Sequence, residues 1–181
     1  MANSRGATIE DLHRVDGKAE LVNGELVLMS AAGYRHGCIA LRVAASLLEY
    51  EKRTGRGHAL PDNVGFVVDL PGRRSFSPDA AFATQPVTDN FVDGAPLFAV
   101  EVRSQDDYGQ AAERTIAEKR ADYFAAGTEV VWDVDPMRDQ AVRAYRASDP
   151  ERPSVYRRGE LAGAEPALPG WSIRVDDLFA D

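Results

Sequence analysis

The chain has 181 residues, 44% of them hydrophobic and 28% charged, which is typical of a folded globular protein and predicts one domain over residues 1–181. Its net charge of -8 argues against a broadly basic nucleic-acid-binding protein, because neutralising phosphates supplies much of the affinity of such proteins. A single cysteine, Cys38, excludes an internal disulfide and a cysteine zinc site, and the lack of a signal-like or membrane-length apolar run predicts a cytoplasmic protein.

Residues 8–52 are predicted to form a short helix, a β-hairpin and a long helix. Thr8 begins a sequence that resembles a helix capping box. Asn23-Gly24 between two apolar runs predicts a hairpin over residues 19–30. The long helix, residues 37–52, is expected to end at Gly55 and to bury one stripe. That stripe consists of Ile39, Ala40, Val43, Leu47 and Tyr50.

The rest of the chain predicts strands and one further helix. The strands are expected at Val64–Leu70, Phe76–Thr84, Leu97–Ser104, Glu129–Val134, Ala141–Tyr145 and Ser154–Tyr156. The helix, residues 107–126, ends at Gly127, a typical position for a left-handed cap. The tail is expected to dock through Trp171, Ile173 and Leu178. This order predicts an α/β fold with a mixed sheet flanked by helices and an N-terminal hairpin.

Two acids stand at the ends of apolar strands. Strand alternation places Phe98, Val100 and Val102 on one face, and Ala99, Glu101 and Arg103 on the other. In the preceding strand, Asp79 shares a face with two alanines. If the strands are neighbours, Asp79 and Glu101 converge, and with a backbone carbonyl they suit Mg²⁺ or Mn²⁺. The alternative is that both acids are solvated edge residues.

A lysine lies on the apolar side of the second long helix. On a helical wheel Lys119 falls close to Tyr108 and Tyr123. It either extends along its stem to water, or places an ammonium beside the acidic pair. A companion acidic site favours the second interpretation, because such an ammonium could orient an attacking water and neutralise charge on a phosphate.

Further charged residues have two interpretations each. Glu20 is either a third carboxylate of the site or an exposed hairpin glutamate. His36 is either a core histidine with one hydrogen bond, or a residue that supports the site or contacts the scissile phosphate. Arg103 lies on the face of the second acid and could contact a substrate phosphate. Arg73 and Arg74 could do the same, although surface charge on a turn is the ordinary explanation.

In order and spacing these motifs resemble the Uma family of putative restriction endonucleases, long named a domain of unknown function, within the PD-(D/E)XK nuclease superfamily. The matching pieces run over nearly the whole chain. They are Glu20-Leu-Val-Asn-Gly-Glu25, His36, Ser77-Pro-Asp79, Val100-Glu-Val-Arg-Ser104, Lys119 with Tyr123 and Gly127, Val131-Trp-Asp-Val-Asp-Pro136, and Leu178-Phe179.

The resemblance implies a restriction-endonuclease-like fold in which Asp79 and Glu101 are the metal-binding acids. Glu20 would be the additional acid from the N-terminal element. The superfamily pattern places a lysine two positions after the second acid, where this chain has Arg103. An arginine fork does not replace a compact ammonium. Lys119, in the following helix, would take over that role.

The resulting hypothesis is a Mg²⁺- or Mn²⁺-dependent DNA endonuclease. The residues expected to bind the metal are Glu20, Asp79, Glu101 and the carbonyl of Val102. Lys119 would help activate water, and His36 would support the ligands. The alternatives are a catalytically silent, nuclease-like binding or assembly module, and a nuclease for another nucleic acid. Residues 129–134 and the hairpin could also mediate a homodimer, which would suit cleavage of both strands of a duplex.

Overall fold

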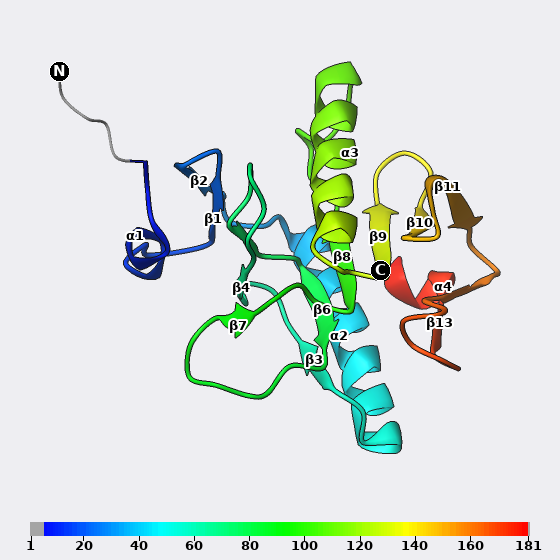
Figure 1. Ribbon diagram of the computed structural model, residues 1–181. Helices are drawn as coiled ribbons and strands as arrows, with labels where there is room; N and C mark the ends of the chain where they lie inside the picture. The colour runs from blue at the N-terminus through cyan, green and yellow to red at the C-terminus, as the bar shows by residue number, and fades with distance from the viewer. Residues whose placement is uncertain (1–5, 181) are drawn as a thin grey trace, which may run out of the picture.

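A six-stranded mixed sheet forms the centre of the computed structural model, which describes residues 6–180 (Figure 1). Its strand order is β11-β10-β9-β8-β6-β3. The bounds are β3 (His58–Leu60), β6 (Ala80–Ala83), β8 (Phe98–Val102), β9 (Val130–Asp135), β10 (Ala141–Arg146) and β11 (Asp149–Tyr156). β8 and β9 run parallel, and the other neighbours run antiparallel. The expected α/β class with a mixed sheet is therefore confirmed.

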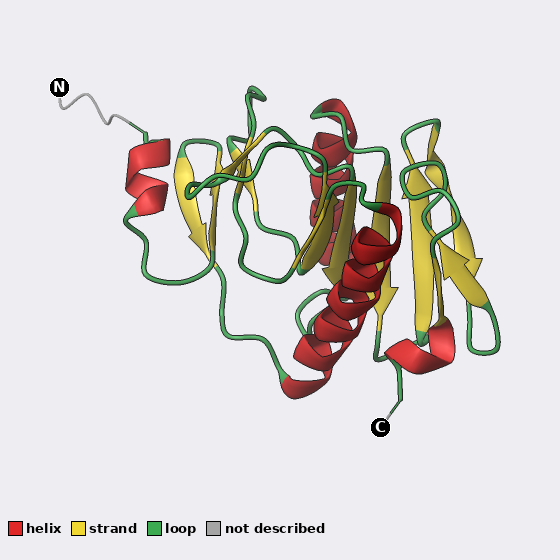
Figure 2. Ribbon diagram, turned by 90° about the horizontal axis from the view of Figure 1, so that it is seen from below, coloured by secondary structure: helices red, strands yellow, loops and turns green. Residues whose placement is uncertain are grey.

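The first long helix, α2 (Tyr34–Thr54), covers one face of this sheet (Figure 2). It begins earlier than predicted and ends at Gly55, which has a φ of 64°. The five residues of the predicted stripe are its five buried residues. All but Ala40 pack in one cluster with Phe82, Phe98, Val100 and Trp132 of the sheet. Burial of this stripe supplies most of the stabilisation of the helix, as is usual for an amphipathic segment.

The second long helix, α3 (Gln110–Ala125), lies on the opposite face (Figure 2). Tyr123 is its one fully buried residue. The Tyr123 ring stacks on Phe76 with a centroid distance of 3.9 Å. Around it pack the small residues of this face, Ala81, Ala83, Ala99 and Val131. The alanines let the helix approach the sheet closely, and the predicted assignment of the two strand faces is confirmed.

The N-terminal part matches its prediction. In α1 (Ile9–His13), Thr8 and Asp11 form a complete capping box. The hairpin pairs β1 (Ala19–Val22) with β2 (Glu25–Leu28). Asn23 and Gly24 have φ values of 51° and 76°, the left-handed geometry that a two-residue hairpin turn requires.

The middle of the chain differs from its prediction. The expected strand at 64–70 is reduced to β4 (Phe66–Val67), which joins β5 (Ser75–Phe76) and β7 (Val92–Asp93) in a small sheet. The expected strand at 76–84 is interrupted between β5 and β6. Pro78 lies at the interruption, where its missing N–H cannot support a ladder. This break separates the two strands into different sheets and leaves Asp79 directly before β6.

The C-terminal segment packs as predicted. It contains a hairpin of β12 (Leu161–Gly163) and β13 (Ser172–Arg174), which was not predicted, and α4 (Val175–Leu178). Trp171 packs against Trp132 with a centroid distance of 5.1 Å. Trp171, Ile173 and Leu178 join the core beneath α2, which confirms the docking of the tail.

The structure does not support the prediction that residues 129–134 mediate a homodimer. β9 is hydrogen-bonded to β8 on one side and to β10 on the other, so it has no free edge for a second copy. Strand β2 of the hairpin does expose apolar side chains at its end away from the turn, with Val27 46% and Leu28 69% exposed. Among residues 6–180, no helix is both long enough and apolar enough to cross a membrane.

Candidate active site

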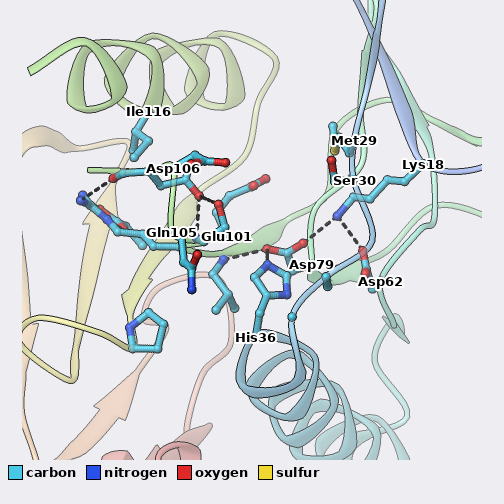
Figure 3. Close-up of a pocket in the computed structure, with 18 of the residues that line it drawn as sticks. Lys18, Met29, Ser30, His36, Asp62, Asp79, Glu101, Gln105, Asp106 and Ile116 are labelled. Carbon is cyan, nitrogen blue, oxygen red and sulfur yellow. Dashed lines mark hydrogen bonds and ion pairs between the residues drawn. The ribbon is translucent and has the colours of Figure 1, made fainter. Parts of the chain in front are cut away.

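A cavity of about 1140 Å³ opens beside the ends of β6 and β8, between the beginning of α2 and the side of α3 (Figure 3). Its lining includes Lys18, His36, Asp79, Glu101 and Lys119. Segments far apart in the sequence thus contribute ionisable groups to one hollow. The volume exceeds what a small ligand needs, so the cavity can admit part of a larger, extended molecule.

Strand pairing brings Asp79 alongside Glu101. The antiparallel register pairs Ala80 with Val100. Asp79, which precedes Ala80, therefore lies opposite Glu101, which follows Val100. The Asp79 N–H donates to the Val100 carbonyl at 2.9 Å. The Val102 N–H donates to Asp79 Oδ2 at 2.8 Å. The backbone of β8 therefore fixes the carboxylate of Asp79 at the cavity wall.

Two basic side chains also contact Asp79. Lys18 Nζ lies 2.6 Å from Oδ1, and His36 Nε2 lies 3.1 Å from Oδ2. Burial alone would raise the pKa of Asp79, but the hydrogen bond from His36 and the charge of Lys18 outweigh it and hold this pKa far below its usual value. The same hydrogen bond raises the pKa of His36 against the effect of burial. Asp79 is therefore ionised at neutral pH.

Lys119 joins two acids. Its Nζ lies 2.9 Å from Glu101 Oε2 and 2.9 Å from Glu20 Oε1. The Lys119 side chain is only 18% exposed, so it does not extend along its stem to water. Burial lowers its pKa, but the charges of Glu101 and Glu20 more than compensate and raise it. The ammonium stays charged beside the acidic pair.

Glu101 is the carboxylate with the least favourable surroundings. Burial raises its pKa, Lys119 opposes that effect, and the nearby charges of Asp79 and Glu20 add to it, so the net shift is upward. The Tyr123 hydroxyl donates to Glu101 Oε1 at 2.7 Å and fixes its orientation. The Glu101 carboxylate thus shares the Lys119 ammonium with Glu20 and lies near the negative charge of Asp79.

Glu20 lies deeper than the sequence suggested. Its side chain is 4% exposed, and it is not among the described residues that line the cavity. Oε2 accepts from Arg73 Nη1 at 2.6 Å, and Oε1 accepts from the Ser77 N–H at 2.9 Å as well as contacting Lys119. Burial raises the pKa of Glu20, but Lys119 and Arg73 outweigh it and lower this pKa. Glu20 is thus neither an exposed hairpin residue nor open to the cavity, and it anchors Lys119 from behind.

Arg103 has different partners from those expected. Its Nε and Nη2 donate to the two oxygens of Asp133 at 2.7 and 2.6 Å. Its Nη1 and Nη2 also donate to Glu113 on α3. The expected contact with a substrate phosphate is therefore not supported, because all three guanidinium nitrogens already bind carboxylates. Arg103 instead ties β8 to β9 and to α3.

Two residues near the site, Lys18 and Asp62, escaped the sequence analysis. Lys18 precedes Glu20 by two positions, and residues so spaced share a face of a strand, which was the available signal. Asp62 contacts Lys18 Nζ at 2.6 Å and comes from a turn with no motif. The position of Tyr123 near Lys119 is predicted by the helical wheel, but its hydrogen bond to Glu101 is not. Arg73, which was weighed as a surface or phosphate-binding residue, is buried and also binds Asp122 Oδ2 at 2.8 Å.

The donor set fits a small divalent cation held by two protein carboxylates. Mg²⁺ is usually bound by one or two carboxylates, with water and phosphate oxygens completing its shell, and seldom by a cage made only of protein. Asp79 and Glu101 supply such a pair on the cavity wall. Within residues 6–180, no three His, Cys, Asp or Glu side chains form a ready-made metal cluster. The fit is therefore to a cation that shares its coordination with water or substrate.

The mixed sheet, with acids meeting at the ends of two paired strands, defines a nuclease-like α/β protein. The chain belongs to the Uma2 family, described as "Putative restriction endonuclease", whose family model matches residues 8–176. It is similar in fold to a crystal structure from Anabaena variabilis ATCC 29413, described as a "putative nuclease belonging to DUF820". That similarity has a TM-score of 0.75 at 18% identity and covers 95% of this chain and 97% of the other. No curated protein matches the chain.

Proposed function

We propose that the protein is a Mg²⁺- or Mn²⁺-dependent nuclease that hydrolyses phosphodiester bonds of DNA. The observation that carries the proposal is the meeting of Asp79, Glu101 and the Lys119 ammonium at one cavity. Membership of the restriction-endonuclease family supports a nuclease reaction. We further propose that residues 1–181 act as one domain, an interpretation supported by a family match that covers most of the chain.

Asp79, Glu101 and the Val102 carbonyl are the groups proposed to hold the cation. Such a cation, when bound, lowers the pKa of a coordinated water and neutralises charge on the phosphate. Glu20 was also expected among the ligands, but its two oxygens bind Arg73, the Ser77 N–H and Lys119. Its proposed role is therefore to hold Lys119 in position.

The chain's own residues would orient the reactants and stabilise charge. The Lys119 ammonium, fixed by two carboxylates, is suited to orient the attacking water and to stabilise the negative charge that develops on the phosphate. As the water oxygen bonds to phosphorus, the bond to the leaving oxygen breaks on the opposite side. His36 and Tyr123 hold Asp79 and Glu101, respectively, in fixed orientations through hydrogen bonds.

Cleavage of plasmid DNA in Mn²⁺ or Mg²⁺ tests the proposal. Asp79→Asn and Lys119→Met should each reduce the rate by about 100-fold or more, because each removes a group that acts on the reacting phosphate or its water. Asp93→Asn changes an exposed acid on β7 and should cut at the wild-type rate. Equal cutting by all three variants and the wild type would refute the assignment.

A catalytically silent binding or assembly module is the second candidate. The net charge of -8 favours it, as does the neutralisation of every site carboxylate by a basic side chain of the protein. Calorimetric titration with MnCl₂ separates the two functions. The nuclease requires binding that is lost in Asp79→Asn and Glu101→Gln, whereas the module requires no such site.

The kind of nucleic acid and the assembly state belong to the proposal as well. Profiling single- and double-stranded DNA and RNA decides whether DNA is the preferred substrate. A homodimer is proposed through β2 of the β1–β2 hairpin, which exposes Val27 and Leu28 and has no strand beyond it in the two-stranded sheet. Light scattering of the wild type and of Leu28→Asp measures it.

A further inference from the structure

Lys18 lies between two carboxylates at the wall of the cavity. Its Nζ is 2.6 Å from Asp79 Oδ1 and 2.6 Å from Asp62 Oδ1 (Figure 3). The Lys18 side chain is 15% exposed, whereas that of Asp62 is 37% exposed. The ammonium thus bridges a buried acid, proposed to bind metal, and a more open acid.

The two oxygens of Asp79 are not equally available. Oδ2 accepts from the Val102 N–H, which belongs to the backbone of β8, and from His36 Nε2. Among residues 6–180, Oδ1 forms its hydrogen bond and ion pair with the Lys18 ammonium alone. A cation that binds Asp79 through Oδ1 must therefore take the place of this ammonium.

The ammonium can leave Asp79 without leaving the cavity. A lysine head is a compact charge on a flexible four-carbon stem, and it needs no fixed fork geometry to keep a partner. Asp62 already holds it from the more open side. Asp62 Oδ1 is itself fixed by the Asn63 N–H at 2.7 Å, so this second partner is preorganised. A displaced ammonium would therefore stay at the cavity wall, paired with Asp62 alone.

We propose that Lys18 is an exchangeable counter-ion of Asp79, which a divalent cation displaces and which then binds a phosphate group of the nucleic acid. The inference rests on the proposed function, which it extends by a further phosphate-binding residue. Lys18 therefore competes with the metal and assists the nucleic acid. Removing its charge should affect the two kinds of binding in opposite directions.

Two binding measurements on Lys18→Gln test the inference. Calorimetry with MnCl₂ should give a Kd about tenfold lower than that of the wild type, because no ammonium has to be displaced. Fluorescence anisotropy of a short DNA duplex in CaCl₂ should give a Kd about tenfold higher, because a phosphate contact is lost. A merely structural role would weaken both kinds of binding, because the cavity itself would be damaged.

Two further variants serve as controls. Lys52→Gln removes an exposed lysine of α2 that pairs with Glu49 and should change neither Kd. Lys18→Arg keeps the charge and should bind Mn²⁺ no more tightly than the wild type. Circular dichroism melting checks that each variant is folded.

The possible failures can be told apart. If the wild type binds Mn²⁺ and Lys18→Gln binds it no more tightly, the inference is wrong while the proposed function stands. Unchanged DNA binding by Lys18→Gln also overturns the inference. If the wild type binds no Mn²⁺ at all, the proposed function is wrong, and the inference that rests on it is wrong as well.

Discussion

The Nζ of Lys119 lies 2.9 Å from Oε2 of Glu101, although 18 residues and a change from strand to helix separate them. The parallel pairing of β8 and β9 accounts for this contact, since the connection between parallel strands must cross over the sheet. Here α3 makes that crossing on the face that bears Glu101. The crossing helix can therefore deliver an ammonium that no nearby residue of the strand supplies.

Lys119→Met should destabilise the metal-free protein by about 3–5 kcal/mol, because the buried Glu20 and the partly buried Glu101 lose the cation between them. Urea unfolding measures this change. Lys52→Met, at an exposed pair on α2, should stay within about 0.5 kcal/mol of the wild type. Adding Glu20→Gln to Lys119→Met should recover part of the lost stability, because the unpaired carboxylate is then removed. Strictly additive losses of stability would contradict an energetic coupling between Glu20 and Lys119.

Tyr123→Phe should cost about 1–3 kcal/mol, because the ring and its stack on Phe76 remain while Glu101 Oε1 loses a donor. The measurement is again urea unfolding. Tyr34→Phe is the matched control, since Tyr34 is 91% exposed. An equal effect of the two substitutions would show that the hydroxyl of Tyr123 contributes nothing particular.

Arg103→Lys should destabilise the protein by about 3–5 kcal/mol, because one ammonium cannot replace the fork that binds Asp133 and Glu113. It should also fail to restore cleavage when combined with Lys119→Met. Arg56→Lys, at an exposed position, is the control for stability. Recovery of cleavage in the double variant would mean that the strand position can still serve the reaction.

Asp135 should contribute to the stability of the fold in a way that is lost in acid. Burial raises its pKa, but the Arg138 N–H, the Tyr108 hydroxyl and the Met137 N–H outweigh this effect and lower it. As the pH falls, Asp135 of the unfolded chain therefore takes up a proton before Asp135 of the folded protein does. The stabilisation by the ionised carboxylate is fully present above about pH 4 and is lost as the pH falls through the lowered pKa of the folded state.

Asp135→Asn should therefore be about 1–3 kcal/mol less stable than the wild type at neutral pH. This difference should shrink as the pH falls below about 4. Urea unfolding across this range, down to the pH at which the wild type itself unfolds, measures the difference. A gap for Asp135→Asn that is constant with pH would contradict the assignment.

Periodicity predicted the parts of the fold in which local pattern and burial agree. The stripe from Ile39 to Tyr50 and the turn at Asn23-Gly24 are cases of this kind, since a helix face and a left-handed turn leave direct marks on the sequence. β3 was missed because three residues, His58–Leu60, carry no measurable alternation. The break at Pro78 could have been anticipated from its missing N–H.

The part of the site that could be predicted is the part that strand alternation and helical spacing determine. They indicated that Asp79, Glu101 and Lys119 face one side of the sheet, and the structure does bring these three together. Partners could not be predicted in the same way. Lys18 meets Asp79 across 61 residues, and Arg73 meets Glu20 across 53, and no local pattern encodes such pairs. The depth of Glu20 follows from those same distant contacts.

The dispersed origin of the cavity wall has a consequence during synthesis of the protein. Lys18, Asp79 and Lys119 enter from three separate stretches of chain, and Tyr123 lies beyond all of them. A nascent polypeptide that has emerged only as far as β8 carries both strand acids but neither the amine nor the phenol that hold Glu101. The acidic site is thus completed late, once the ribosome has released α3 to fold over the sheet.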